Sequence, residues 1–316
     1  MKKKLGWAAV ALFVIFFIMY LIPKSISKQV NINANFDNTY RILSNLAGWK
    51  KWNPAVKHLY EDSLLTVTSS GNKKNITFSH NNDSISIKEI NPLAFNVAGN
   101  IQAEIFSYNF SLIPSQSTYA ITIELHENTR LLYTLFPFLR KPSEGEKALT
   151  ALKKYLENSL NIYGYTINAE KVSKDTVFAV IEAAEAKEDV FKVMQQRFDV
   201  LSKYVHENGL KQNGFFSISY IPRNDSVFLI TGIKVNKFAA PSLPVHCVNV
   251  PKNAKMLTAV FNGKFADRNK IFTAFEKYRR DHFLETVGSP IESYIDNKLP
   301  VSDSSTVQFK LYYPVR

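Results

Sequence analysis

An acid and a tyrosine stand two positions apart near the C-terminus, at Glu292 and Tyr294. Side chains two residues apart on a β-strand point to the same face, so a strand here would present the carboxyl and the phenol together. A partly buried carboxylate without a basic partner is costly, and a cationic ligand or an added proton would offset that cost. The pair could therefore bind a cation, or activate water with Glu292 as general base and Tyr294 as a proton donor or orienting group. The structural alternatives are an exposed glutamate at a sheet edge and one paired with Lys310.

The second half of the chain contains an internal repeat, which appears when the sequence is shifted by 74 residues. Each copy reads as strand, helix, strand, strand, over residues 176–235 and 255–313, and a Pro-containing linker over 236–253 joins them. The shift places Ile218 on Glu292, so one copy would supply an apolar wall and the other a carboxylate. The ligand-binding residues predicted for this half are Ile218, Tyr220, Phe261, Glu292, Tyr294 and Tyr312.

Two such copies side by side predict an antiparallel sheet with two helices on one face and a groove along the pseudo-two-fold axis. The end of the chain has a Glu-x-Tyr sequence within Gly288–Asp296 and a Tyr-x-Pro sequence within Phe309–Val315. These segments resemble the GyrI-like family, the effector-binding domain of multidrug-responsive transcription regulators, and the resemblance covers residues 170–316.

The GyrI-like resemblance implies a role for Glu292, with Tyr294 beside it. In that family a glutamate on this strand binds cationic aromatic drugs, and in some relatives it is proposed to act in hydrolysis. The regulators carry a DNA-binding helix-turn-helix ahead of the effector domain, whereas this chain has a different domain in that place.

That other domain, over residues 27–160, has its own order of elements. A short strand over 30–34 precedes a helix that residues 37–38 would cap, and a longer helix begins with a capping box formed by Ser143 and Glu146. Alternating segments separated by turn residues lie between the two helices. The strands predicted from them are 63–69, 74–79, 84–90, 94–100, 104–112 and 118–126.

In the first domain, the residues most informative about the fold flank that first helix: Asn33–Asp37 lie before it and Trp49–Pro54 lie after it. They resemble the SRPBCC superfamily, the START-like helix-grip fold of polyketide cyclases. The resemblance implies a curved sheet wrapped around a long helix, with an apolar cavity between them. Trp49 and Trp52 are the ligand-binding candidates here, and a place in the core is their structural alternative. The predicted fold class is therefore α+β in both domains.

The chain begins with three lysines followed by an uncharged run, Leu5–Ile22, which would be about 27 Å long as a helix. This pattern predicts a single transmembrane anchor over residues 1–24, and a cleaved signal peptide is the alternative. Lysines before the run place the N-terminus in the cytoplasm and both domains outside it, in the periplasm if the source is a Gram-negative bacterium.

The composition excludes several functional classes. The net charge of +12 is scattered and lacks an aromatic-interleaved stripe, so we expect no nucleic-acid partner. With 11 glycines, one cysteine and no phosphate-cradling or zinc-binding motif, we expect neither a cofactor nor a metal. The sequence thus predicts a membrane-anchored, non-catalytic protein that captures or senses apolar or cationic amphipathic small molecules. The alternatives are a hydrolase of reactive electrophiles that uses Glu292, and a sensor that signals to a protein partner.

Overall fold

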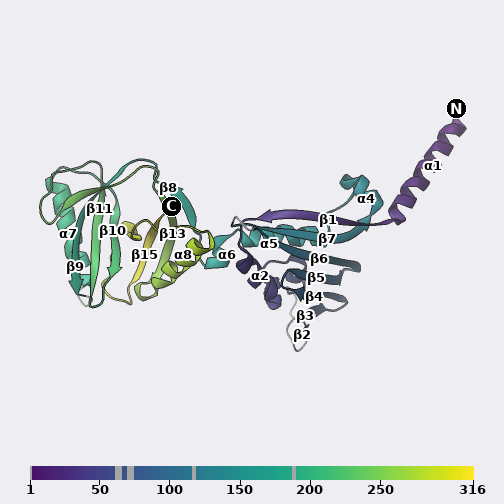
Figure 1. Cartoon of the computed structure of the whole chain (residues 1–316), viewed down its shortest axis with the longest axis horizontal. Helices are drawn as coiled ribbons and strands as arrows, with labels where there is room; N and C mark the ends of the chain where they lie inside the picture. The colour runs from purple at the N-terminus through teal and green to yellow at the C-terminus, as the bar shows by residue number, and fades with distance from the viewer. Residues whose placement is uncertain (1, 61–65, 70–74, 116–118, 187–189) are drawn as a thin grey trace. The chain divides into compact units, whose positions relative to one another are not determined.

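The computed structural model describes the chain except residues 1, 61–65, 70–74, 116–118 and 187–189 (Figure 1). The chain divides into two compact units, Met1–Asn158 and Ser159–Arg316. Each unit combines helices with one antiparallel sheet, so the α+β class is confirmed.

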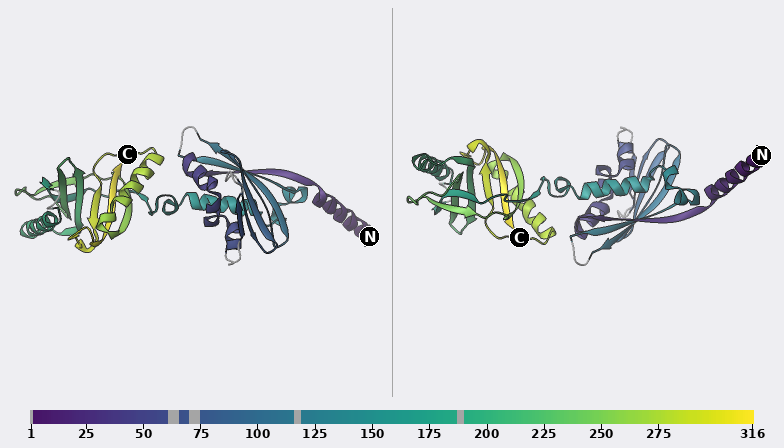
Figure 2. Two further views of the ribbon diagram at one scale, coloured as in Figure 1. Left: turned by 90° about the horizontal axis from the view of Figure 1, so that it is seen from below. Right: turned by 90° about the horizontal axis from the view of Figure 1, so that it is seen from above.

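The described strands of the N-terminal unit form a curled, seven-stranded sheet (Figure 2). Neighbouring strands are antiparallel throughout, in the order β1-β7-β6-β5-β4-β3-β2. Apolar side chains alternate along β3 to β7 and face the core. The strands are β1 (Pro23–Ile32), β2 (Thr66–Ser69), β3 (Asn75–His80), β4 (Asp83–Asn91), β5 (Ala94–Ile101), β6 (Glu104–Pro114) and β7 (Ile121–Arg130).

The predicted capping box opens the main helix of this unit. The Ser143 hydroxyl accepts a hydrogen bond from the Glu146 amide, and the Glu146 carboxylate accepts one from the Ser143 amide, which confirms the prediction. The cap predicted at 37–38 is wrong, because Asn35 has the extended backbone of an N-cap and accepts from the amide of Asn38. The helices are α2 (Phe36–Ser44), η1 (Leu46–Lys51), α3 (Pro54–Tyr60), α4 (Leu131–Leu135), η2 (Pro137–Leu139) and α5 (Glu144–Leu156).

Helix α1 (Lys2–Leu21) precedes the sheet of the N-terminal unit, and strand β1 begins at Pro23 directly after it. Among the residues that the structure describes, no helix is long and apolar enough to cross a membrane. The structure therefore does not show the anchor predicted over residues 1–24. The location of both units outside the cytoplasm stays a prediction.

The described strands of the C-terminal unit form an eight-stranded sheet that contains both predicted copies, in the order β12-β9-β11-β10-β14-β15-β13-β8. The first copy supplies β9 (Thr176–Ala186), α7 (Val190–Glu207), β10 (Gln212–Pro222) and β11 (Ser226–Val235). The second supplies β13 (Lys255–Lys264), α8 (Asn269–Asp281), β14 (Ile291–Tyr294) and β15 (Thr306–Val315).

The two copies meet where β10 pairs with β14 at the centre of the sheet. Ile218 pairs in register with Glu292, and these residues occupy the same position in the two copies. The pseudo-two-fold axis therefore passes through this pair. Helices α7 and α8 cover the face to which both side chains point, and apolar side chains from both helices and the central strands share one core there.

Two edge strands were not predicted. Strand β12 (His246–Val250) lies within the predicted linker and pairs with β9, and β8 (Asn168–Lys171) pairs with β13 at the opposite edge. Residues 172–175 and 251–254 consequently cross between the edges and hydrogen-bond to each other. The shorter elements are α6 (Ser159–Tyr163), η4 (Phe265–Asp267) and η5 (Ile295–Asn297).

Candidate functional site

Glu292 lies on the pseudo-two-fold axis and is fully buried, with 0% of its surface exposed. Its neighbours across the sheet are Ile218 on β10 and Leu311 on β15, both also 0% exposed. Because paired residues share a face of the sheet, this places the carboxyl group in apolar surroundings beneath the helices. Neither of the two structural alternatives holds, since the side chain is not exposed and Lys310 pairs instead with Glu170.

The Glu292 carboxyl group has one satisfied and one unsatisfied oxygen. Tyr294 donates a hydrogen bond of 2.6 Å to Oε2, whereas Oε1 is buried without a hydrogen-bond partner. Nε of Arg268 lies 3.5 Å from Oε1, close enough for an ion pair but without the geometry of a hydrogen bond. The prediction of an acid without a basic partner is therefore wrong, because Arg268 lies within ion-pair distance of Glu292, although it makes no hydrogen bond to Oε1.

Burial has the largest influence on the pKa of the Glu292 carboxyl group. Desolvation raises the pKa of Glu292 to about 7, and the Tyr294 hydrogen bond and the Arg268 charge oppose that rise. Burial and the neighbouring Glu292 also raise the pKa of Tyr294 and of Tyr220, so both phenols carry their protons at neutral pH. The carboxyl group thus takes up and releases its proton near neutrality, while the tyrosines remain donors.

Arg268 covers the carboxyl group from the junction of η4 and α8. Its guanidinium lies 4.0 Å from the ring centre of Phe265 and 4.9 Å from that of Tyr220, distances that fit cation–π contacts. The side chain remains 23% exposed, against 1% for that of Glu292. A partly solvated cation therefore lies over two aromatic rings and beside the buried acid.

The same shift of 74 residues relates further side chains stacked along the axis. Met194 of α7 corresponds to Arg268, and Phe191 corresponds to Phe265. The Phe191 and Phe265 rings touch each other, with centroids 5.2 Å apart, where the two helices begin. We call this set the axis site; it comprises Phe191, Met194, Ile218, Tyr220, Phe265, Arg268, Glu292 and Tyr294.

The other predicted ligand-binding residues are dispersed. Phe261 is buried on β13, two strands from Glu292, and stacks on Phe309 of β15, which contacts the ring of Tyr294. Tyr312 pairs with Ile291 and points to the opposite face of the sheet from Glu292. The structure thus brings Ile218, Tyr220 and Tyr294 to the acid, places Phe261 behind them, and separates Tyr312.

Trp49 and Trp52 belong to the core of the N-terminal unit. They are 0% and 3% exposed, and their ring centroids lie 4.5 Å apart. Trp49 also packs near Phe95 and Phe110, and its indole N–H donates to the carbonyl of Leu43 at 2.8 Å. These contacts correspond to the structural alternative considered for both tryptophans.

Sequence reasoning missed Arg268, Phe265, Phe191 and Met194. The repeat contained the signal, because applying its shift to the helices aligns Met194 with Arg268 just as it aligns Ile218 with Glu292. Within the described part of the chain, no group of three or more His, Cys, Asp or Glu side chains could hold a metal ion.

No family model matches the sequence, and neither does any curated protein. Solved structures are similar to part of the chain. The isolated C-terminal domain of EcmrR has 15% sequence identity and a TM-score of 0.40, and the match covers 48% of this chain and 98% of that domain. In the EcmrR–DNA complex, at the same identity and TM-score, the match spans only 57% of the EcmrR chain.

Two further structures are similar at lower scores. The structure of SAV2435 bound to tetraphenylphosphonium has 12% identity and a TM-score of 0.32, covering 48% of this chain and 93% of that one. The Zhui aromatase/cyclase from a Streptomyces species has 9% identity and a TM-score of 0.31, covering 44% of this chain and 96% of that one.

Proposed function

We propose that the C-terminal unit binds a cationic small molecule with an apolar body at the axis site, with Glu292 as its counter-ion. The observation that carries this proposal is the Glu292 carboxyl group, fully buried on the axis with Oε1 unpaired by any hydrogen bond. An ionised carboxylate in apolar surroundings is unfavourable unless a cation accompanies it. A ligand that brings a positive charge to Oε1 would remove that cost.

Arg268 provides an internal stand-in for such a ligand. It holds a positive charge between the rings of Phe265 and Tyr220 and next to Glu292, which is the environment an aromatic or quaternary cation prefers. Because the Arg268 side chain is partly exposed and makes no hydrogen bond to the acid, it can turn outward into water. A ligand would then take its place once the contact between Phe191 and Phe265 opens.

The test uses tetraphenylphosphonium, an apolar cation that carries no titratable proton, and isothermal titration calorimetry on the full chain. Truncating one partner of a buried charge pair typically costs several kcal/mol, so Glu292→Gln should weaken binding by about 30-fold or more. Glu276→Gln is the matched control, because Glu276 lies on α8 of the same copy and its carboxylate accepts from Tyr313 and Arg279 away from the axis. Equal affinities for the parent and Glu292→Gln would refute the proposal.

The hydrolase alternative has one observation in its favour. A general base works best when its pKa lies near the working pH, and the pKa of Glu292 is raised to about 7 with a tyrosine hydroxyl beside it. Water would have to reach the buried carboxyl group, so this chemistry needs the same opening as ligand binding. Hydrolysis of a reactive ester that persists unchanged in Glu292→Gln would exclude the role, whereas its loss in a folded variant would support it.

A further inference from the structure

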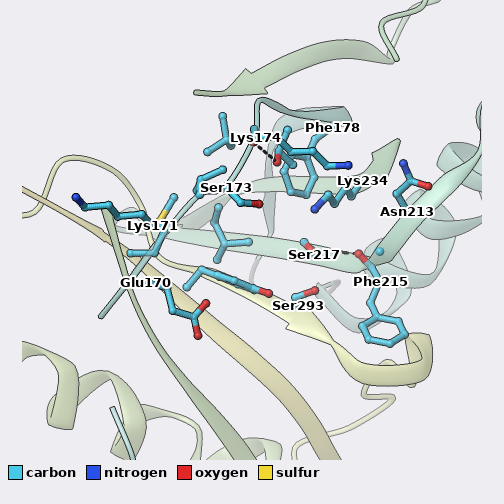
Figure 3. Close-up of a pocket in the computed structure, with 17 residues that line it drawn as sticks. Glu170, Lys171, Ser173, Lys174, Phe178, Asn213, Phe215, Ser217, Lys234 and Ser293 are labelled. Carbon is cyan, nitrogen blue, oxygen red and sulfur yellow. Dashed lines mark hydrogen bonds between the residues drawn. The ribbon is translucent and has the colours of Figure 1, made fainter. Parts of the chain in front are cut away.

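We propose that the C-terminal unit has a second binding site, for an amphipathic organic anion, on the sheet face opposite the helices. A pocket of about 380 Å³ opens there, within the size range of small-molecule sites (Figure 3). Its floor includes Ser217 and Ser293, which pair across β10 and β14. Because these serines alternate with Ile218 and Glu292 along the strands, the pocket and the axis site lie on opposite faces of one sheet.

Three lysines make the pocket electropositive. Lys171, Lys174 and Lys234 all line it, and none forms an ion pair with a residue that the structure describes. Figure 3 shows Lys174, Lys234 and Asn213 at one end and Lys171 with Glu170 at the other. Glu170 is the one acid among the described lining residues, and its carboxylate already accepts from Thr258 and Lys310. The end that holds Lys174 and Lys234 therefore has positive charge without a described counter-ion.

The backbone places Lys234 in the pocket. Its aliphatic stem lies across Gly214, where an added Cβ would come within 3.2 Å of the Lys234 Cβ. Lys234 also pairs in register with Phe178, so both side chains point to the pocket face. Lys234 is thus half-buried, with its stem packed over Gly214 and its side chain part of the pocket lining.

A cross-sheet segment positions Lys174. The amide of Val172 donates to Ala254, the amide of Asn253 donates back to Val172, and the amide of Lys252 donates to the carboxylate of Asp175. These bonds tie the chain on both sides of Lys174 to the neighbouring crossing segment. Lys174 therefore belongs to a hydrogen-bonded rim of the pocket.

The lining defines the class of ligand. The positive end suits one carboxylate, sulfonate or phosphate group, and the hydroxyl of Ser293 on the pocket floor has no described partner. The rest of the lining is largely apolar and suits an aromatic or aliphatic body. The apolar lining residues are Val172, Phe178, Phe215, Val250, Met256, Ile291 and Tyr312.

The experiment compares two fluorescent molecules that differ in charge, 8-anilinonaphthalene-1-sulfonate and uncharged N-phenyl-1-naphthylamine, titrated into the full chain at low ionic strength. The double variant Lys174→Gln/Lys234→Gln removes the positive end of the pocket. We expect it to weaken binding of the sulfonate by about tenfold, as the loss of charge-assisted contacts predicts, and to leave the uncharged compound unaffected. Circular dichroism checks that the variant is folded.

The matched control is Lys192→Gln/Lys203→Gln, which makes the same change of net charge on the exposed side of α7. It should bind the sulfonate as the parent does. Equal sulfonate affinity in the parent and the pocket variant would overturn the proposal, and so would an equal loss in the two double variants. Glu292→Gln should leave sulfonate binding unchanged, so the outcome is independent of the cation site.

Discussion

The two copies of the repeat share one backbone plan and differ in how each treats its buried charge. In the first copy the charge is Arg197, 6% exposed, whose guanidinium donates to the carbonyl of Leu229 at 3.1 Å and to the carboxylate of Glu185. In the second copy the charge is Glu292, fully buried and with one oxygen lacking a hydrogen bond. Each charged residue has an isoleucine at the equivalent position of the other copy.

Arg197 has a structural role, whereas the Glu292 carboxyl group keeps one oxygen that a ligand could contact. The Arg197 side chain is bonded by its own copy and fastens α7 to the sheet. On the axis, the first copy places Met194 and Ile218 where the second places Arg268 and Glu292. An apolar pair has thus been replaced by an ion pair with incomplete bonding, which leaves a position where a ligand can do better than the protein does alone.

The largest expected effect concerns the stability of the C-terminal unit, which contains Glu292. The pKa of Glu292 is about 7 in the folded chain and near its ordinary value when unfolded, so the folded state binds the extra proton between these values. The contribution of Glu292 to stability therefore falls as pH rises to about 7 and then stays level, a total of up to about 3 kcal/mol. Glu292→Gln lacks this penalty and should be more stable than the parent at pH 8 but not at pH 4.5. Urea unfolding at both pH values measures this, and an equal difference at both would contradict it.

The second prediction exchanges each basic residue for methionine. Arg197→Met should cost about 2 kcal/mol at any pH from 6 to 9, because it strands a buried carbonyl and Glu185. Arg268→Met makes the second copy resemble the first and should cost much less at pH 6, where Glu292 can stay protonated. Its cost should grow at pH 9, where the carboxylate would lack a cation. Thermal unfolding at the two pH values distinguishes the pair, and parallel pH profiles would break the contrast.

The third prediction concerns competition at the axis site. If Arg268 occupies the place of the ligand, Arg268→Met should bind tetraphenylphosphonium about tenfold more tightly than the parent at pH 9, where Glu292 is ionised in both. Calorimetry on the full chain measures this difference. Weaker binding by the variant would show instead that Arg268 helps to form the site.

The smallest expected effect compares the two tyrosines. Tyr294→Phe removes the hydrogen bond to Glu292 and should cost about 1 kcal/mol at pH 8, whereas Tyr220→Phe removes a 3.3 Å contact to the sulfur of Met194 and should cost less. Tyr294→Phe should also raise the pKa of Glu292, since that hydrogen bond lowers it. Urea unfolding of both variants at pH 8 tests the order, and a larger cost for Tyr220→Phe would reverse it.

The sequence predicted the parts of the axis site that depend on local rules. Spacing of two along a strand placed Glu292 with Tyr294, and the repeat placed Ile218 opposite them. Tyr312 was assigned to the wrong face because the register of β14 on β15 depends on the chain between them, which no periodicity fixes. Arg268 was missed because its contact with the acid joins a helix start to a strand through packing alone.

The same limit applies to the rest of the fold. The capping box at Ser143 followed from two residues and their spacing. The edge strands β8 and β12 are short and pair with strands distant in sequence, so their own residues gave no signal. The pocket on the opposite sheet face depends on those strands and on the two crossing segments between them, and was therefore outside sequence reasoning as well.

The most direct test of the cation site is the affinity for tetraphenylphosphonium between pH 5 and 9, measured in the parent and in Glu292→Gln. Because the cation should bind the ionised carboxylate, parent affinity should rise about tenfold per pH unit up to about pH 7 and then level off. Glu292→Gln should bind weakly and without this pH dependence. A parent affinity that does not change with pH, or a profile shared by both proteins, would contradict the assignment of Glu292 as the counter-ion.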